Sequence, residues 1–208
     1  EIADIAGLTP GDTIFFIADR EAQAALYAGQ IRTELGNRLD LIEKNSYRFC
    51  YINDFPMYEY DNEEKKYIFT HNPFSMPQGG LEALNTKEPS EILAYQYDIV
   101  CNGVELSSGA VRNHDMEIMV KAFEIAGYTE DDLKEKFGAL YNAFQFGAPP
   151  HAGMAPGVDR MIMLLRNEEN IREVIPFPMN GNAQDLMCGA PSEVTEQQLR
   201  ETHIKVRQ

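Results

Sequence analysis

Residues 147–160 read Gly-Ala-Pro-Pro-His-Ala-Gly-Met-Ala-Pro-Gly-Val-Asp-Arg, and the apolar run Met161 to Leu165 follows them. Prolines and glycines at this density cannot continue a helix. The small residues Ala152, Gly153 and Ala155 leave an extended backbone on which a flat ligand can pack closely. The stretch therefore predicts a ligand-facing strand that leads directly into a helix.

The predicted helix begins at Gly157, Val158 and Asp159, which puts Arg160 in or near its first turn. A helix dipole disfavours a cation and favours an anion at this end. An arginine placed there indicates an anionic partner. The residues leave one alternative open, an ion pair between Arg160 and a neighbouring carboxylate, either Asp159 or one from another strand.

The composition is that of an ordinary globular protein, with 44% hydrophobic and 25% charged residues among 208. This length can bury one good core and part of a second domain. No apolar run approaches the roughly 18 residues of a membrane span, and no signal peptide is recognisable at the start, so we expect a cytoplasmic protein with no membrane contact. A net charge of -15 argues against broad binding of nucleic acid.

The first part of the chain predicts one strand and one helix. The run Thr13 to Ala18 is typical of a buried strand, and Asp19 can cap a helix whose apolar residues recur at helical spacing. Gly36 is the expected end of that helix. We place a domain boundary near Tyr47.

The rest of the chain predicts an α+β fold, an antiparallel sheet flanked by helices. Tyr67 to Thr70 reads as the hairpin partner of Phe49 to Ile52, across an acidic loop. The clearest hairpin is joined by Asn102-Gly103, the strongest two-residue turn signal. Its strands, and the helices that the periodicity and capping signals indicate, are expected at 93–101 and 104–111, and at 116–126, 129–144 and from 195 onward.

Two acidic side chains are expected on one face of that hairpin. With a two-residue turn Val100 faces Glu105, so the alternation of side chains puts Asp98 on the same face as Glu105. Mg²⁺ usually takes one or two carboxylates together with substrate phosphates. The alternative is a polar outer face on which both carboxylates are simply solvated.

Arg112 follows the small residues Ser107, Ser108 and Gly109, which often mark a bulge or the close approach of a ligand. A guanidinium binds a planar carboxylate through two parallel hydrogen bonds, so Arg112 is a candidate reader of an aspartate side chain. A surface ion pair with a nearby acid is the alternative in so acidic a chain.

The stretch 147–160 resembles motif 3 of the class II aminoacyl-tRNA synthetases. Several other segments narrow the resemblance to the bacterial-type aspartyl enzymes. They occur in the expected order and extend the resemblance from about Phe49 to Ser192. These segments are Asp54–Glu59, His71–Phe74, Tyr97–Glu105, Gly109–His114 and Lys136–Gly138.

The resemblance implies a role for each candidate residue. It implies that Arg160 is catalytic, on the ATP phosphates, and that Arg112 and His71 bind aspartate. The implied magnesium ligands are Asp98 and Glu105, and the implied ATP-binding residues are Glu105, Gly157, Val158, Asp159 and Arg160. Two departures from the family pattern are Asn72, where a second histidine is common, and the serines Ser107 and Ser108, where glycines are more frequent.

The resemblance also implies an organisation and an activity. Residues 1–46 would be the C-terminal part of an insertion domain, and residues 47–208 the C-terminal part of the class II catalytic domain. The parent enzyme would use ATP and Mg²⁺ to activate aspartate and pass it to tRNA(Asp), which it would contact mainly through regions outside this chain, as a homodimer. Because motifs 1 and 2 are not found here, the isolated chain is expected to be inactive.

Two alternatives to this function remain open. One is an asparaginyl or non-discriminating synthetase, because an arginine can also bind an amide oxygen. The other is a non-catalytic fragment derived from a synthetase that binds a nucleotide or a protein partner.

Overall fold

The computed structural model describes residues 1–207, and the chain divides into two compact units, residues 1–47 and a second unit that begins at Arg48. The first unit contains the helices α1 (Ile2–Ala6) and α2 (Glu21–Arg38) and buries no side chain. Among residues 1–207, none of the helices has both the length and the apolar character that crossing a membrane requires.

Three expectations for the first unit are wrong. Thr13 to Ala18 form no strand, because no described residue offers them a neighbouring strand to complete a ladder of hydrogen bonds. Helix α2 is not capped by Asp19, whose carboxylate accepts a hydrogen bond from the Arg20 N–H instead. The helix also continues through Gly36 to Arg38, since an isolated glycine inside a helix costs only about 1 kcal/mol.

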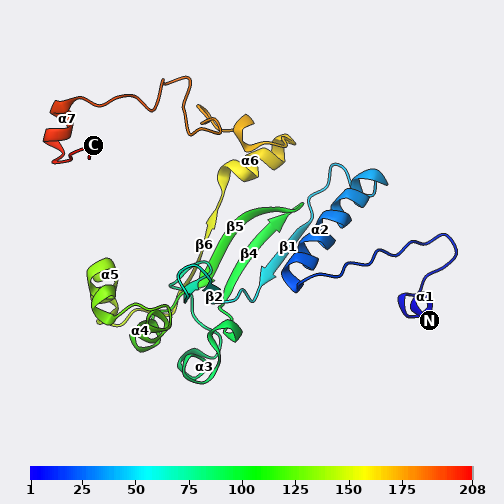
Figure 1. Cartoon of the computed structure of the whole chain (residues 1–208), viewed down its shortest axis with the longest axis horizontal. Coiled ribbons are helices and arrows are strands. Elements are labelled where there is room, and N and C mark those ends of the chain that lie inside the picture. The colour runs from blue at the N-terminus through cyan, green and yellow to red at the C-terminus, as the bar shows by residue number, and fades with distance from the viewer. Residues whose placement is uncertain (208) are drawn as a thin grey trace. The chain divides into compact units, whose positions relative to one another are not determined.

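The second unit is built on a four-stranded antiparallel sheet with the strand order β1-β4-β5-β6, and a separate hairpin, β2-β3, lies outside it. In Figure 1 helices α3, α4 and α5 gather at one end of this sheet, while α6 follows β6 at the other end. Two short 3-10 helices lie at Pro89–Glu91 and Ile171–Glu173. The other elements are β1 (Phe49–Asn53), β2 (Tyr58–Asp61), β3 (Lys66–Phe69), α3 (Gly80–Thr86), β4 (Gln96–Cys101), β5 (Val104–Val111), α4 (Met116–Ile125), α5 (Glu130–Phe144), β6 (Ala152–Pro156), α6 (Val158–Arg166) and α7 (Glu196–Glu201).

The hairpin predicted between Phe49–Ile52 and Tyr67–Thr70 is wrong. Strand β1 pairs with β4 along its whole length, and β3 pairs with β2. The chain leaves β1 through Asp54, whose φ of 60° turns it away from a hairpin path. The short β2–β3 loop closes at a small entropic cost, which favours that local pairing.

The β4–β5 hairpin is confirmed. Asn102 and Gly103 have φ values of 51° and 82°, as a type I′ turn requires, and Val100 lies opposite Glu105. The strand-to-helix transition at residues 152–166 is confirmed by β6 and α6. The helices expected after residues 115 and 129 are confirmed as α4 and α5, and the side chains of Asp115 and Thr129 cap them.

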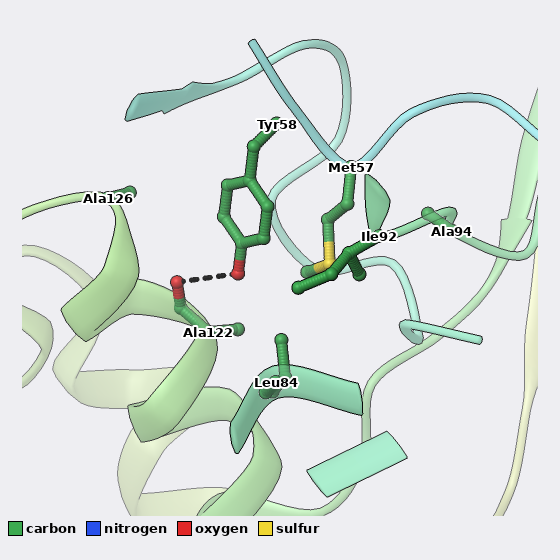
Figure 2. Close-up of a cluster of buried hydrophobic side chains, with 7 residues drawn as sticks. All are labelled: Met57, Tyr58, Leu84, Ile92, Ala94, Ala122 and Ala126. Carbon is green, nitrogen blue, oxygen red and sulfur yellow. Dashed lines mark hydrogen bonds between the residues drawn. The ribbon is translucent and has the colours of Figure 1, made fainter. Parts of the chain in front are cut away.

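The core lies between the β2–β3 hairpin and helices α3 and α4. Figure 2 shows its main cluster, in which the Tyr58 hydroxyl donates a hydrogen bond of 2.9 Å to the Ala122 carbonyl. Burial raises the pKa of Tyr58 well above its ordinary value, so the hydroxyl keeps its proton and its hydrogen bond. The residues of the cluster are Met57, Tyr58, Leu84, Ile92, Ala94, Ala122 and Ala126.

A second, aromatic cluster anchors the segment that leads to the candidate site. Phe123 and Leu133 are buried in it, and the ring of Phe74 packs 5.6 Å from Phe123 and 5.1 Å from Phe137. Phe137 has non-helical dihedral angles inside α5, where the helix kinks. Residues 71–75 are thus fixed at Phe74 by ring packing.

Candidate functional site

The candidate residues share one face of the strands β4, β5 and β6. Asp98 lies opposite Ser108, which lies opposite Ala155, so these three side chains project from the same face. By the same register, Ala110 lies opposite Gly153 on this face. The floor between the charged groups is therefore made of small residues, as expected for a strand on which a flat ligand packs.

A β-bulge on β5 puts Glu105 on the same face as Ser108. Val100 pairs with Glu105 but Ile99 pairs with Ser107, so Leu106 is the extra residue on β5. Beyond the bulge Asp98 pairs with Ser108. Asp98 and Glu105 consequently lie on one face of the ribbon, as the alternation predicts.

The expectation for Ser107, Ser108 and Gly109 is correct only in part. The bulge is present next to them, and β5 runs continuously through all three residues. The close approach at Gly109 comes from the protein itself, because a Cβ there would lie 2.5 Å from the Tyr97 ring and 2.5 Å from the Gly153 carbonyl. Ser107 is buried on the opposite face, and Ser108 is exposed on the candidate face.

Arg160 is held against the bulge. Its Nη1 donates a hydrogen bond of 2.7 Å to the Glu105 carbonyl and lies 3.3 Å from Oε1 of the same residue. Both side chains remain half exposed, at 44% for Arg160 and 46% for Glu105. The ion pair with a carboxylate from another strand, which the sequence left open, is thus present in the structure.

Gly157, Val158 and Asp159 form the start of α6 next to this pair. The Gly157 N–H donates a hydrogen bond of 2.7 Å to the carbonyl of Leu106, the bulged residue. A Cβ on Gly157 would lie 3.4 Å from both that carbonyl and the Arg160 side chain. The bulge therefore holds the start of α6 through this hydrogen bond. Because Gly157 has no side chain, the Arg160 side chain can pack over it.

Arg112 lies at the far end of β5 from Glu105. Its N–H donates to the His151 carbonyl, and its guanidinium lies over Gly153, where a Cβ would be 3.5 Å from Nη2. Within residues 1–207 the Arg112 guanidinium forms no ion pair or side-chain hydrogen bond, so the surface ion pair that the sequence left open is absent there. A cation over a glycine on the open face can receive a carboxylate.

His71 is exposed, and its ring packs edge-on against Phe55 at 4.9 Å. The Oδ1 of the neighbouring Asn72 accepts a hydrogen bond of 2.9 Å from the Phe74 N–H. Asn72 therefore closes an Asx turn within the loop. His71 is therefore connected to the candidate face through the backbone of residues 71–75.

Gln96 connects this loop to the sheet, although the sequence pattern did not single it out. Its amide donates to Ser75 Oγ at 2.7 Å and to the Asn72 carbonyl at 3.2 Å. One sequence signal does point to it, since Gln96 stands two residues before Asp98 and so shares its face.

The acidic pair suits a magnesium ion held jointly with phosphates. Among residues 1–207 no three His, Cys, Asp or Glu side chains come together, so the protein offers at most two carboxylates. Oxygen donors from two carboxylates, with phosphate oxygens completing the shell, are the set that Mg²⁺ prefers. Asp98 and Glu105 fit this requirement.

The resemblance to the class II tRNA synthetases is confirmed by comparison with known protein families. The model of the family described as tRNA synthetases class II (D, K and N) matches residues 17–181, and the chain belongs to this family.

The most similar relatives include bacterial ligases. The chain is 62% identical over 205 residues to the aspartate–tRNA(Asp/Asn) ligase of Zymomonas mobilis and 58% identical over 207 residues to the aspartate–tRNA ligase of Streptomyces avermitilis. These alignments cover 99% and 100% of this chain but only 34% and 35% of the relatives. The chain thus spans about a third of their length. A solved aspartyl-tRNA synthetase from Entamoeba histolytica is similar with a TM-score of 0.49 and 23% identity, over 88% of this chain and 30% of that one.

Proposed function

We propose that this chain supplies the C-terminal part of the catalytic domain of an aspartate–tRNA ligase, with residues 1–46 the tail of an insertion domain. The observation that carries the proposal is the order of charges along one face. Arg112 stands at the end of β5, Asp98 lies opposite its middle, and Glu105 with Arg160 stands at its start. Seven residues of strand, roughly 20 Å of backbone, separate Glu105 from Arg112.

This order matches the charges of aspartate and ATP lying end to end. Arg112 binds the β-carboxylate of aspartate through its guanidinium fork, and His71 closes over the amino acid from its loop. The α-carboxylate of aspartate then attacks the α-phosphate, and Arg160 stabilises the pyrophosphate as it leaves. No protein nucleophile is needed, because positioning and charge stabilisation drive the step.

Asp98 and Glu105 would hold Mg²⁺ in this scheme. Such an ion would supply positive charge that neutralises the substrate phosphates. Arg160 has five N–H donors, and its bond to the Glu105 carbonyl occupies only one nitrogen. The same arginine can therefore stay anchored to the bulge while its other donors bind phosphate, with Gly157, Val158 and Asp159 forming the adjoining helix start.

The transfer of aspartate to tRNA(Asp) completes the proposed activity. We expect the full-length protein to contact tRNA mainly outside this chain, to form a homodimer and to work in the cytoplasm. A relaxed specificity is the second candidate, because the Zymomonas mobilis relative is named for both tRNA(Asp) and tRNA(Asn). Charging assays with both tRNAs distinguish the two candidates.

Calorimetric titration of this chain with a non-hydrolysable aspartyl-adenylate analogue in Mg²⁺ tests the site. Saturable binding that exceeds binding of the asparaginyl analogue supports the proposal. The matched variants are Arg112→Ala, which should remove the preference, and Arg166→Ala, an exposed arginine on α6 that should change nothing. Absence of binding by a folded chain would mean that motifs outside this chain are required and that the chain alone is not the functional unit.

A further inference from the structure

Gln96 is a buried amide on the candidate face whose role the mechanism above does not use. It is 6% exposed and begins β4, two residues before Asp98. Its Nε2 donates to the hydroxyl of Ser75, which is itself fully buried, and to the carbonyl of Asn72. Both acceptors belong to residues 71–75, which we call the His71 loop.

The C-terminal part of the His71 loop is also held through its backbone and through Phe74, since Ser75 forms an isolated antiparallel β-bridge with Arg112. The Phe74 ring packs in the aromatic cluster, and its carbonyl accepts a hydrogen bond of 2.7 Å from the Asn113 N–H. Inside the loop, the Ser75 N–H and the Gln96 amide both donate to the carbonyl of Asn72. Gln96 is thus the side-chain tether between β4 and the residue next to His71.

Losing the hydrogen bonds of Gln96 would change the position of the His71 loop. Leaving a buried hydroxyl or carbonyl without a donor costs more free energy than the net contribution of the hydrogen bond. The segment therefore moves to recover a partner. Phe74 would stay in its cluster, whereas residues 71 and 72 would lose their hydrogen bond to β4 and shift. The Asx turn of Asn72 cannot prevent this, because it lies wholly within the loop.

We propose that Gln96 is a positioning residue, whose buried amide holds the His71 loop against the face that carries Asp98 and thereby fixes His71 over the aspartate end of the site. The part of this inference that concerns aspartate rests on the proposed function. The tether itself does not, so the two can be tested separately.

Hydrogen exchange in this chain tests the tether. In Gln96→Met, which keeps the length and apolar stem but removes the donor, the amides of Phe74 and Ser75 should exchange about tenfold faster. Gln78→Met is the matched control, because the Gln78 amide donates its hydrogen bonds to Asp54 and to the Ala94 carbonyl, which lie outside the His71 loop. Unchanged exchange at Phe74 and Ser75 in Gln96→Met overturns the proposal.

Kinetics in the chain extended to the length of its relatives test the functional part. Gln96→Met should raise KM for aspartate about tenfold and leave KM for ATP within twofold. Ser75→Ala should add little to Gln96→Met, because both remove the same hydrogen bond. Equal losses for the two substrates, or a fall in Tm that accompanies them, would overturn the positioning role. If the unsubstituted protein fails to activate aspartate, the proposed function falls, and faster exchange would then support the tether alone.

Discussion

The two site arginines differ in their contacts within the chain. Arg160 contacts Glu105, whereas the Arg112 guanidinium has no ion pair among residues 1–207. An arginine that lies over a glycine with its donors unused is prepared for an external carboxylate. Removing Arg112 and removing Arg160 should therefore have different effects.

Arg112→Ala should raise KM for aspartate by about a hundredfold and change KM for ATP less than about threefold, since truncating one partner of a desolvated charge pair costs about 2–5 kcal/mol. Steady-state pyrophosphate exchange in the full-length context measures both constants. Arg166→Ala is the control and should match the unsubstituted protein. Equal losses for aspartate and ATP would remove Arg112 from the carboxylate site.

Arg160→Ala should slow adenylate formation by about 10²–10³, the usual effect of losing one donor to a developing charge. Its Tm should fall only slightly, because a half-exposed ion pair contributes about 1 kcal/mol or less. Single-turnover kinetics and a thermal melt of the same preparation measure the two effects. A large fall in Tm with little change in rate would instead mean that the pair with Glu105 is structural.

At the residue scale, the sequence predicts on which face of a strand a side chain lies but not which distant residue it contacts. The shared face of Asp98 and Glu105 follows from the turn at Asn102-Gly103 and side-chain alternation, so it could be predicted. The pairing of Arg160 with Glu105 and the tether from Gln96 to the His71 loop could not, because each joins segments that only the tertiary fold brings together.

Among the elements, local sequence signals predicted a hairpin correctly where the turn alone determines the pairing. They failed where a strand had to choose between partners. The β4–β5 hairpin was predictable because two residues fix its turn. Strand β1 could not be assigned in this way, since its partner β4 lies far along the chain, beyond the nearer β2–β3 pair. The run Thr13 to Ala18 has a strand's composition but no neighbour to pair with among the described residues.

The stability that the capping box gives to helix α5 should depend on pH. Hydrogen bonds from the Thr129 hydroxyl and N–H hold the pKa of Asp132 below its ordinary value of 3.8. The folded state therefore favours the ionised carboxylate, so this stabilisation is complete above pH 3.8 and is lost as the pH falls through the lower folded pKa. Thr129→Ala should lower Tm by about 3 °C at about pH 7 and by less at about pH 3.

Thr195→Ala is the control for this prediction. Thr195 makes the same capping box at the start of α7, a helix of six residues that buries no side chain. Its removal should leave the cooperative melt unchanged, because the helix contributes nothing to the core. An equal loss of Tm in Thr129→Ala at neutral and at acidic pH would contradict the contribution of Asp132.

For the whole molecule, the excess of acidic groups constrains where tRNA can bind. A net charge of -15 repels phosphate, and the cations that the site does use, Arg112 and Arg160, are committed to small ligands in the proposed function. The chain also spans only about a third of its relatives. The proposed tRNA contacts therefore belong mainly to the remaining two thirds.

The division of the chain predicts which part folds alone. Every buried side chain among residues 1–207 belongs to the second unit, and none belongs to residues 1–47. A shortened chain of residues 48–208 should therefore keep its cooperative thermal transition within about 2 °C and keep the amide spectrum of both core clusters, because no core contact is removed. A peptide of residues 1–47 should be only partly helical, since an 18-residue helix without a packed face is marginal in water. Loss of the transition in residues 48–208 would show that the boundary cuts through one folding unit.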